Sequence, residues 1–177
     1  MDKSRVTEIE QAAAETLISF GFYSDETPVD YLDVVLIARS HGFSVYNGGL
    51  PANRDGFVVI QAGPVMIHGE KVDGRVIAVN RDRGGPFKRF LVAHELGHYI
   101  LRHHNRYLPF YHYESGEKTT DDVEADYFAA ALLMPKEMFV RDYQQLENLE
   151  DRFLNLAREY RVRVSDARFR AEMLGLK

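Results

Sequence analysis

His94-Glu95-Leu96-Gly97-His98 carries the strongest signal in this chain. Residues four apart on an α-helix lie on the same face, so the two imidazoles can bind one metal ion at about 2.0–2.1 Å each. Glu95 lies beside that ion without being placed to bind it, in the position of a general base that takes a proton from a metal-activated water. The segment therefore predicts a helix that supplies half of a hydrolytic metal site.

The helix that carries this segment is expected to run from Phe87 to about His103. It follows Gly84-Gly85-Pro86, which places proline in the first helical turn, where its missing N–H is not needed. Apolar residues cover most of the helix circumference, so we predict that the helix is buried. Gly97 lowers helix stability by about 1 kcal/mol relative to alanine. We therefore expect this glycine to permit the close approach of another backbone.

Two histidines need a third ligand, and the sequence offers two candidates. His104 has the spacing of H-E-x-x-H-x-x-G-x-x-H, but this chain has Leu101 in place of the glycine, and on a continuing helix His104 faces away. Glu124 fits better, because it lies in the first turn of a second expected helix, from Asp121 to Met134, beside its apolar stripe. Two histidines and one carboxylate with an open fourth position are the arrangement of catalytic zinc sites. The predicted site thus contains three ligands and a base: His94, His98, Glu124 and Glu95.

Two segments resemble the ImmA/IrrE family of metallopeptidases. They are Phe90–Tyr99, which reads FLVAHELGHY, and Glu124–Pro135, which reads EADYFAAALLMP. The resemblance extends over nearly the whole chain and implies a zincin-like metallopeptidase domain. It also implies the same four roles, with His94, His98 and Glu124 binding the metal and Glu95 acting as general base.

The resemblance further implies a substrate class. Members of the family cleave helix-turn-helix repressors, so we expect an endopeptidase of restricted specificity that acts on a transcriptional repressor. One departure is visible: members often have a histidine four residues after the second ligand, where this chain has Arg102 followed by His103.

Other polar side chains could stabilise the oxyanion or orient the ligands. The candidates for the oxyanion are the following residues: Tyr99, His103, His104, Tyr107, His112, Tyr113 and Tyr127. Asp126 or Asp121 could accept a hydrogen bond from the second ring nitrogen of a ligating histidine. Residues 105–120 are dense in aromatic side chains, and we interpret them either as a wall of the substrate cleft or as a cluster that fixes a surface loop. The sequence does not choose among these alternatives.

The pattern along the rest of the chain predicts an α+β fold with a small twisted sheet in the N-terminal half. Helices are expected at residues 5–20 and 30–41, and strands at 43–46, 56–61, 65–68 and 75–80. Segments 56–60 and 76–80 are suspected of forming a sheet edge that pairs with the substrate backbone. We predict a metallopeptidase domain over residues 1–145 and a helical appendage over residues 146–177.

The appendage supports two rival functions. Residues 149–160 and 165–174 have the outline of a helix-turn-helix, which would suit a DNA-binding regulator. Residues 149–177 contain seven Lys and Arg against five Asp and Glu, so their excess positive charge is small for a module that reads DNA. The second rival is a metal-binding regulator that docks onto a repressor without cutting it. The general base at Glu95 argues against that regulator.

Composition narrows the expected partners, cellular location and cofactor of the protein. The 177 residues contain no cysteine and carry a net charge of −5, so neither a disulfide framework nor a thiolate metal site is expected, and direct nucleic-acid binding is not favoured. No signal peptide or membrane-spanning run is apparent, which predicts a cytoplasmic protein. The expected cofactor is Zn²⁺, with Mn²⁺ as the alternative.

Overall fold

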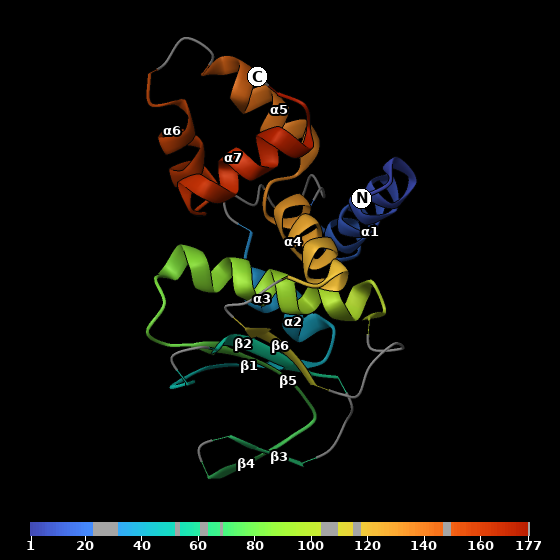
Figure 1. Ribbon diagram of the computed structural model, residues 1–177, viewed down its shortest axis with the longest axis vertical. Helices are drawn as coiled ribbons and strands as arrows, with labels where there is room; N and C mark the ends of the chain where they lie inside the picture. Colours follow the sequence, from blue (N-terminus) through green and yellow to red (C-terminus); the bar gives the residue numbers. More distant parts are fainter. Residues whose placement is uncertain are drawn as a thin grey trace.

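The computed structural model describes residues 1–22, 32–51, 54–60, 64–67, 69–103, 110–114, 118–146 and 150–176. Helices and strands form separate layers (Figure 1). The sheet lies on one side of a central helix, α3, and most of the remaining helices lie on the other. The predicted α+β class is confirmed.

The main sheet has four strands in the order β1-β5-β2-β6. Their bounds are Phe43–Gly48 for β1, Arg54–Val59 for β2, Arg75–Asn80 for β5 and Phe110–Glu114 for β6. Strand β1 runs parallel to β5, and the other two pairs are antiparallel. The edges are therefore β1 and β6. The expectation that segments 56–60 and 76–80 form an edge is wrong, because both segments have partners on each side.

Strand β6 occupies a segment that the sequence predicted as a loop. It pairs with β2 at the edge of the sheet, with Tyr113 opposite Gly56 and His112 opposite Phe57. The residues that flank it, 104–109 and 115–117, lie outside the described part of the chain, and with them most of the predicted cleft wall. A separate two-stranded sheet is formed by β3 (Pro64–Ile67) and β4 (Glu70–Asp73).

Helix α3 (Gly85–Ile100) lies between the two layers. Every residue from Phe90 to His98 is buried, because α3 faces β2, β5 and α2 (Val34–Ser40) on one side and α4 on the other. The helix ends three residues earlier than predicted. Arg102 adopts the left-handed conformation, with φ of 60°, so the chain turns back after the last helical turn.

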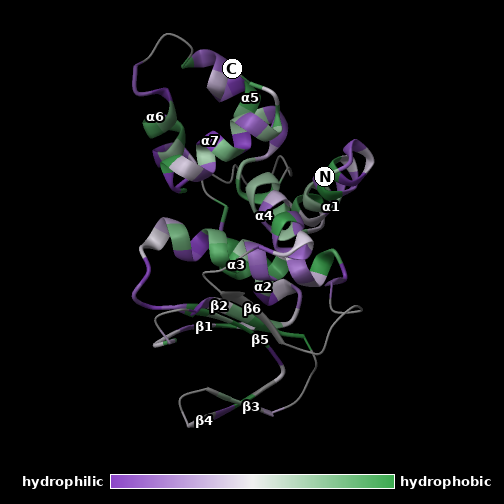
Figure 2. Cartoon of the chain, viewed as in Figure 1, coloured by the Kyte–Doolittle hydropathy of each residue, from purple (hydrophilic) through white to green (hydrophobic). Residues whose placement is uncertain are grey.

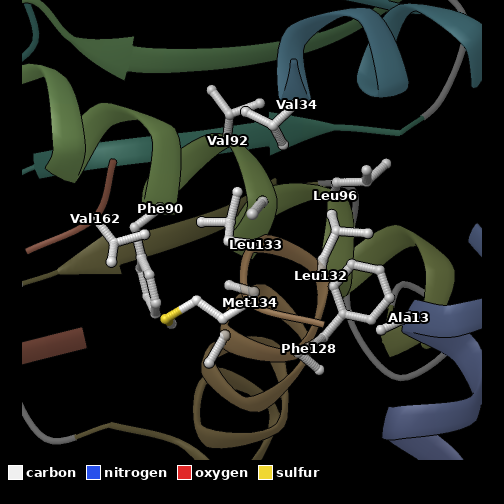
Figure 3. Packing of buried hydrophobic residues seen from close by; sticks show 14 of the residues in the cluster. Ala13, Val34, Phe90, Val92, Leu96, Phe128, Leu132, Leu133, Met134 and Val162 are labelled. Atoms are coloured by element: carbon white, nitrogen blue, oxygen red, sulfur yellow. The ribbon is translucent and has the colours of Figure 1, made fainter. Parts of the chain in front are cut away.

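Helix α4 (Thr120–Leu133) packs between α3 and the N-terminal helix α1 (Lys3–Ser19). Gly97 allows the close contact with α3, since a Cβ at this position would lie 3.0 Å from Phe128 Cδ1. The space next to Gly97 is thus filled by a phenylalanine side chain, where the sequence had suggested a backbone. Figure 3 shows Phe128 beside Leu132 in this core, with Ala13 of α1 close by.

Three helices complete the described part of the chain: α5 (Lys136–Gln145), α6 (Arg152–Glu159) and α7 (Val164–Met173). Arg170 of α7 is fully buried, and its guanidinium donates to Met134 O and to the Glu10 carboxylate of α1. In Figure 2, hydrophobic stretches of α3 and α4 alternate with hydrophilic ones, and the C-terminal helices also contain both kinds of residue. The boundary at residue 145 between a metallopeptidase domain and a helical appendage remains a prediction.

Candidate metal centre

His94 and His98 present their Nε2 atoms to each other on one face of α3. The two nitrogens lie 3.1 Å apart, and both side chains are buried. Asp122 Oδ1, from α4, lies 3.5 Å from His98 Nε2 and 4.0 Å from His94 Nε2. Ligand atoms that share a tetrahedral ion at 2.0–2.1 Å lie roughly 3.3 Å from each other. The three atoms therefore stand close to the spacing that one small divalent cation requires.

Asp122 is held in place by the cap of α4. Its Oδ2 accepts hydrogen bonds from the Thr119 backbone N–H at 2.8 Å and from the Thr119 hydroxyl at 2.7 Å. This capping box occupies one carboxylate oxygen and leaves Oδ1 directed at the histidines. Burial alone would raise the pKa of Asp122, but hydrogen bonds with His98 and Thr119 outweigh it and hold the pKa well below its usual range. The carboxylate is therefore present as an anion.

Asp126 orients the first histidine. Its Oδ1 lies 2.9 Å from His94 Nδ1, and Lys118 forms an ion pair with its other oxygen. A ring nitrogen that donates to a carboxylate fixes the imidazole tautomer and leaves the opposite nitrogen with its lone pair for a metal. Asp126 lies one helical turn after Asp122, so the same face of α4 supplies both carboxylates.

Glu124 does not lie with these ligands. The described group that contains both His94 and His98 within 4.8 Å is completed by Asp122. Glu124 Oε2 instead lies 3.0 Å from His103 Nε2 and accepts from Arg5 Nη2 of α1 at 2.6 Å. The structure thus does not bring Glu124 together with the two histidines, for a physical reason. Residues two apart point to nearly opposite sides of a helix, and α4 is apolar on both the α3 and α1 sides, so its hydrophobic stripe did not reveal which side faces the histidines.

Glu95 is fully buried beside this group. Among the described residues, neither of its carboxylate oxygens has a hydrogen-bond partner. Gly56 of β2 makes room for it, since a Cβ at Gly56 would lie 3.1 Å from Glu95 Oε1. Burial raises the pKa of Glu95 well above its usual range, and the charge of Asp122 adds to this effect. A nearby cation would act in the opposite direction and favour the carboxylate.

Two of the four candidate tyrosines, Tyr99 and Tyr127, have their partners elsewhere. Tyr99 accepts a hydrogen bond from Arg75 Nη1 at 2.9 Å, and its ring packs against Phe43. Tyr127 packs edge-on against Phe169 of α7, with ring centroids 5.2 Å apart. His104 and Tyr107 lie outside the described residues, and for His112 and Tyr113 only the backbone is described. His103, by contrast, is buried next to His98, with their Nδ1 atoms 2.9 Å apart.

The residues present fit a divalent cation. Five carboxyl groups are buried or half-buried at the junction of α3 and α4: Glu95, Asp121, Asp122, Glu124 and Asp126. Ion pairs with Arg5 and Lys118 offset the charge of two of them. A buried carboxylate without a partner is costly, so the unpaired oxygens of Glu95 and the facing nitrogen pair indicate a site built for a cation and its water ligand.

The family model of the IrrE N-terminal-like domain, peptidase family M78, matches residues 52–172. The chain belongs to this family. It is a metallopeptidase-family protein, which agrees with the resemblance seen in the sequence. Helix α1, helix α2 and strand β1 precede the matched region, whereas α3 to α7 lie wholly or largely within it. No curated protein matches the chain.

The sequence held one unused signal for Asp122. Asp122 and Asp126 have the same spacing as His94 and His98, and two such pairs on packed helices face each other over one turn. The roles of Arg5 and Gly56, which approach the site from distant parts of the chain, had no comparable signal.

In the part of the chain that the structure describes, every helix is too short or too polar to cross a lipid bilayer.

Proposed function

We propose that this protein is a zincin-like endopeptidase in which His94, His98 and Asp122 hold one divalent metal ion. The observation that carries this proposal is the spacing of the three ligand atoms, 3.1 to 4.0 Å, next to the unpaired carboxylate of Glu95. A structural metal site would have no use for a buried, unpaired base at this position.

When bound, the metal supplies Lewis acidity and lowers the pKa of its water ligand toward neutrality. Glu95 accepts a proton from the attacking water and returns it to the leaving nitrogen of the peptide. Its burial keeps bulk water away and makes the carboxylate a stronger proton acceptor than an exposed glutamate. Asp126 holds His94 in the tautomer that directs the lone pair of Nε2 toward the metal position.

The ligand set favours zinc. Two imidazoles and one carboxylate in a roughly tetrahedral arrangement are typical of catalytic Zn²⁺, whereas Mn²⁺ prefers more oxygen ligands. The absence of cysteine from the chain removes the thiolate sites that compete for zinc.

The substrate that we propose is a helix-turn-helix transcriptional repressor, on the strength of the family resemblance. The described C-terminal helices do not favour DNA as the partner. Arg170 is buried, and Arg163 forms an ion pair with Asp166 and lies over the Phe87 ring at 3.9 Å. Two of the positive charges in this region therefore take part in packing. Docking onto the repressor suits the C-terminal helices better than DNA binding does.

Zinc-loaded protein incubated with candidate repressors tests this proposal, with mass spectrometry of the products. Glu95→Gln is expected to retain zinc and lose cleavage. Glu15→Gln, an exposed glutamate of α1, is the matched control and should cleave like the wild type. Unchanged cleavage by folded, zinc-loaded Glu95→Gln would refute the proposal. Binding of a repressor without cleavage would favour the docking regulator.

A further inference from the structure

A chain of four side chains leads from the metal centre to the N-terminal helix. His98 Nδ1 lies 2.9 Å from His103 Nδ1, His103 Nε2 lies 3.0 Å from Glu124 Oε2, and Arg5 Nη2 donates to the same oxygen at 2.6 Å. His98, His103 and Glu124 are buried, so water does not compete strongly for these contacts.

The position of each proton follows from metal binding. When His98 Nε2 gives its lone pair to a metal, its Nδ1 carries the proton and donates to His103 Nδ1. His103 then accepts at Nδ1, so its own proton is on Nε2 and is donated to Glu124. Glu124 accepts as a carboxylate, and Arg5 supplies the positive charge that such a buried anion needs. Every contact has one donor and one acceptor in this arrangement.

Backbone geometry explains how His103 reaches this position. Helix α3 ends at Ile100, and Arg102 has a φ of 60°, which most residues other than glycine avoid. The turn brings His103 back beside His98 instead of continuing the helix. Strain of this kind persists where surrounding contacts hold it, and here the contacts are those of His103 with His98 and Glu124.

We propose that His103, Glu124 and Arg5 form a positioning relay that sets the tautomer and orientation of His98, so that helix α1 is part of the metal centre. The inference rests on the proposed function. It gives Glu124 a role other than that of ligand. It also assigns a role to Arg5, which precedes the region that the family model matches.

A second metal ion is the competing interpretation of the same residues. His103, Asp121 and Glu124 also place ligand atoms within 4.8 Å of one another. The relay is favoured because both ring nitrogens of His103 already face polar partners and because the Arg5 guanidinium contacts the Glu124 oxygen that a cation would bind. The number of metal ions per chain separates the two interpretations.

Zinc affinity, measured by competition with a chelating dye, tests the relay without relying on activity. His103→Phe removes both ring nitrogens and is expected to weaken zinc binding about 10–100-fold, the usual effect of losing a group that orients a ligand. His103→Asn places an amide oxygen near the position of Nδ1 and should recover part of the loss. Arg5→Met, at a half-buried position, should weaken binding less than His103→Phe does.

Glu8 and Glu124 provide a matched pair of test positions, because both side chains contact Arg5. Glu124→Gln should weaken zinc binding, whereas Glu8→Gln, at an exposed position, should leave it unchanged. NMR of the zinc-loaded protein gives a second readout. The His98 Nδ1–H proton is expected to show the downfield shift of a hydrogen-bonded imidazole in the wild type and to lose that shift in His103→Phe, an effect that a merely structural role would not produce.

The outcomes separate the relay from the proposed function. Zinc affinities of His103→Phe and Glu124→Gln within twofold of the wild type would overturn the relay, as would an unchanged shift of the His98 Nδ1–H proton in zinc-loaded His103→Phe. Two zinc ions per wild-type chain, falling to one in Glu124→Gln, would replace it with a second metal site. A wild type that binds no zinc would remove both proposals. Zinc binding with an intact relay but without any peptide cleavage would contradict the proposed function alone.

Discussion

Replacing Gly97 by alanine should damage the metal centre without touching a ligand. The added Cβ would lie 3.0 Å from Phe128 Cδ1 and 3.3 Å from both Cβ and Cγ of that ring. Carbon atoms pack comfortably at about 3.5–4.0 Å, so α4 must move away from α3 by roughly half an ångström or more. Asp122 and Asp126 lie on α4 and must move with it.

The magnitude follows from two opposing terms. Alanine in place of glycine stabilises a helix interior by about 1 kcal/mol, whereas overpacking a core costs about 1–3 kcal/mol. The free energy of unfolding of the metal-free protein should therefore fall by about 0–2 kcal/mol. Metal–ligand distances in sound sites hold to within about 0.2 Å, and disturbing the groups that orient ligands costs about 10–100-fold in affinity, so the affinity for zinc should fall by about tenfold or more.

Urea unfolding of the metal-free protein and dye competition for zinc measure the two effects separately. Gly85→Ala is the control, because a Cβ at Gly85, also on α3, meets no atom within 4 Å. It should change neither quantity appreciably. Zinc affinity of Gly97→Ala within twofold of the wild type would refute the argument that the close approach of α3 and α4 sets the ligand positions.

Three further predictions concern the site itself. Asp122→Asn should lower zinc affinity by at least about 100-fold, which is more than the loss of an orienting group causes. Asp82→Asn, at an exposed position, is the control and should leave zinc affinity unchanged. Equal zinc affinities of Asp122→Asn and the wild type would exclude Asp122 as a ligand. Gly56→Ala, whose Cβ would press on Glu95 Oε1 at 3.1 Å, should reduce turnover at full zinc occupancy, and normal turnover would show that Glu95 needs no such space. In the metal-free protein, burial lowers the pKa of His98 to about 4, so its stabilising contribution is complete above the unfolded value near 6.5 and is lost as the pH falls toward 4. The free energy of unfolding should therefore decrease over this range more steeply in the wild type than in His98→Gln, and parallel curves would contradict the assignment.

Local periodicity explains what the sequence predicted well. His94, Glu95 and His98 lie on one helix, and the positions of their side chains follow from the helical repeat alone. Thr119 and Asp122 likewise have the spacing of a capping box, a local pattern that fixes the start of α4 and the position of Asp122. Such features depend on residues within one or two turns.

Features that depend on distant partners were predicted less well. The ligand role of Glu124 was inferred from the hydrophobic stripe of α4, but that helix is buried against both α1 and α3, so the stripe has no single inward side. The end of α3 was missed because an arginine adopts a left-handed φ at position 102. Strand order in the sheet is set by pairing across the chain, which explains the incorrect edge assignment of segments 56–60 and 76–80.

The position of the metal ion tests the central claim most directly. Crystals of the zinc-loaded protein, measured at the zinc absorption edge, give an anomalous peak at each bound zinc. The account predicts one peak per chain, about 2.0–2.2 Å from His94 Nε2, His98 Nε2 and an Asp122 carboxylate oxygen. A peak ligated by Glu124 in place of Asp122, or no peak between the two histidines, would contradict it.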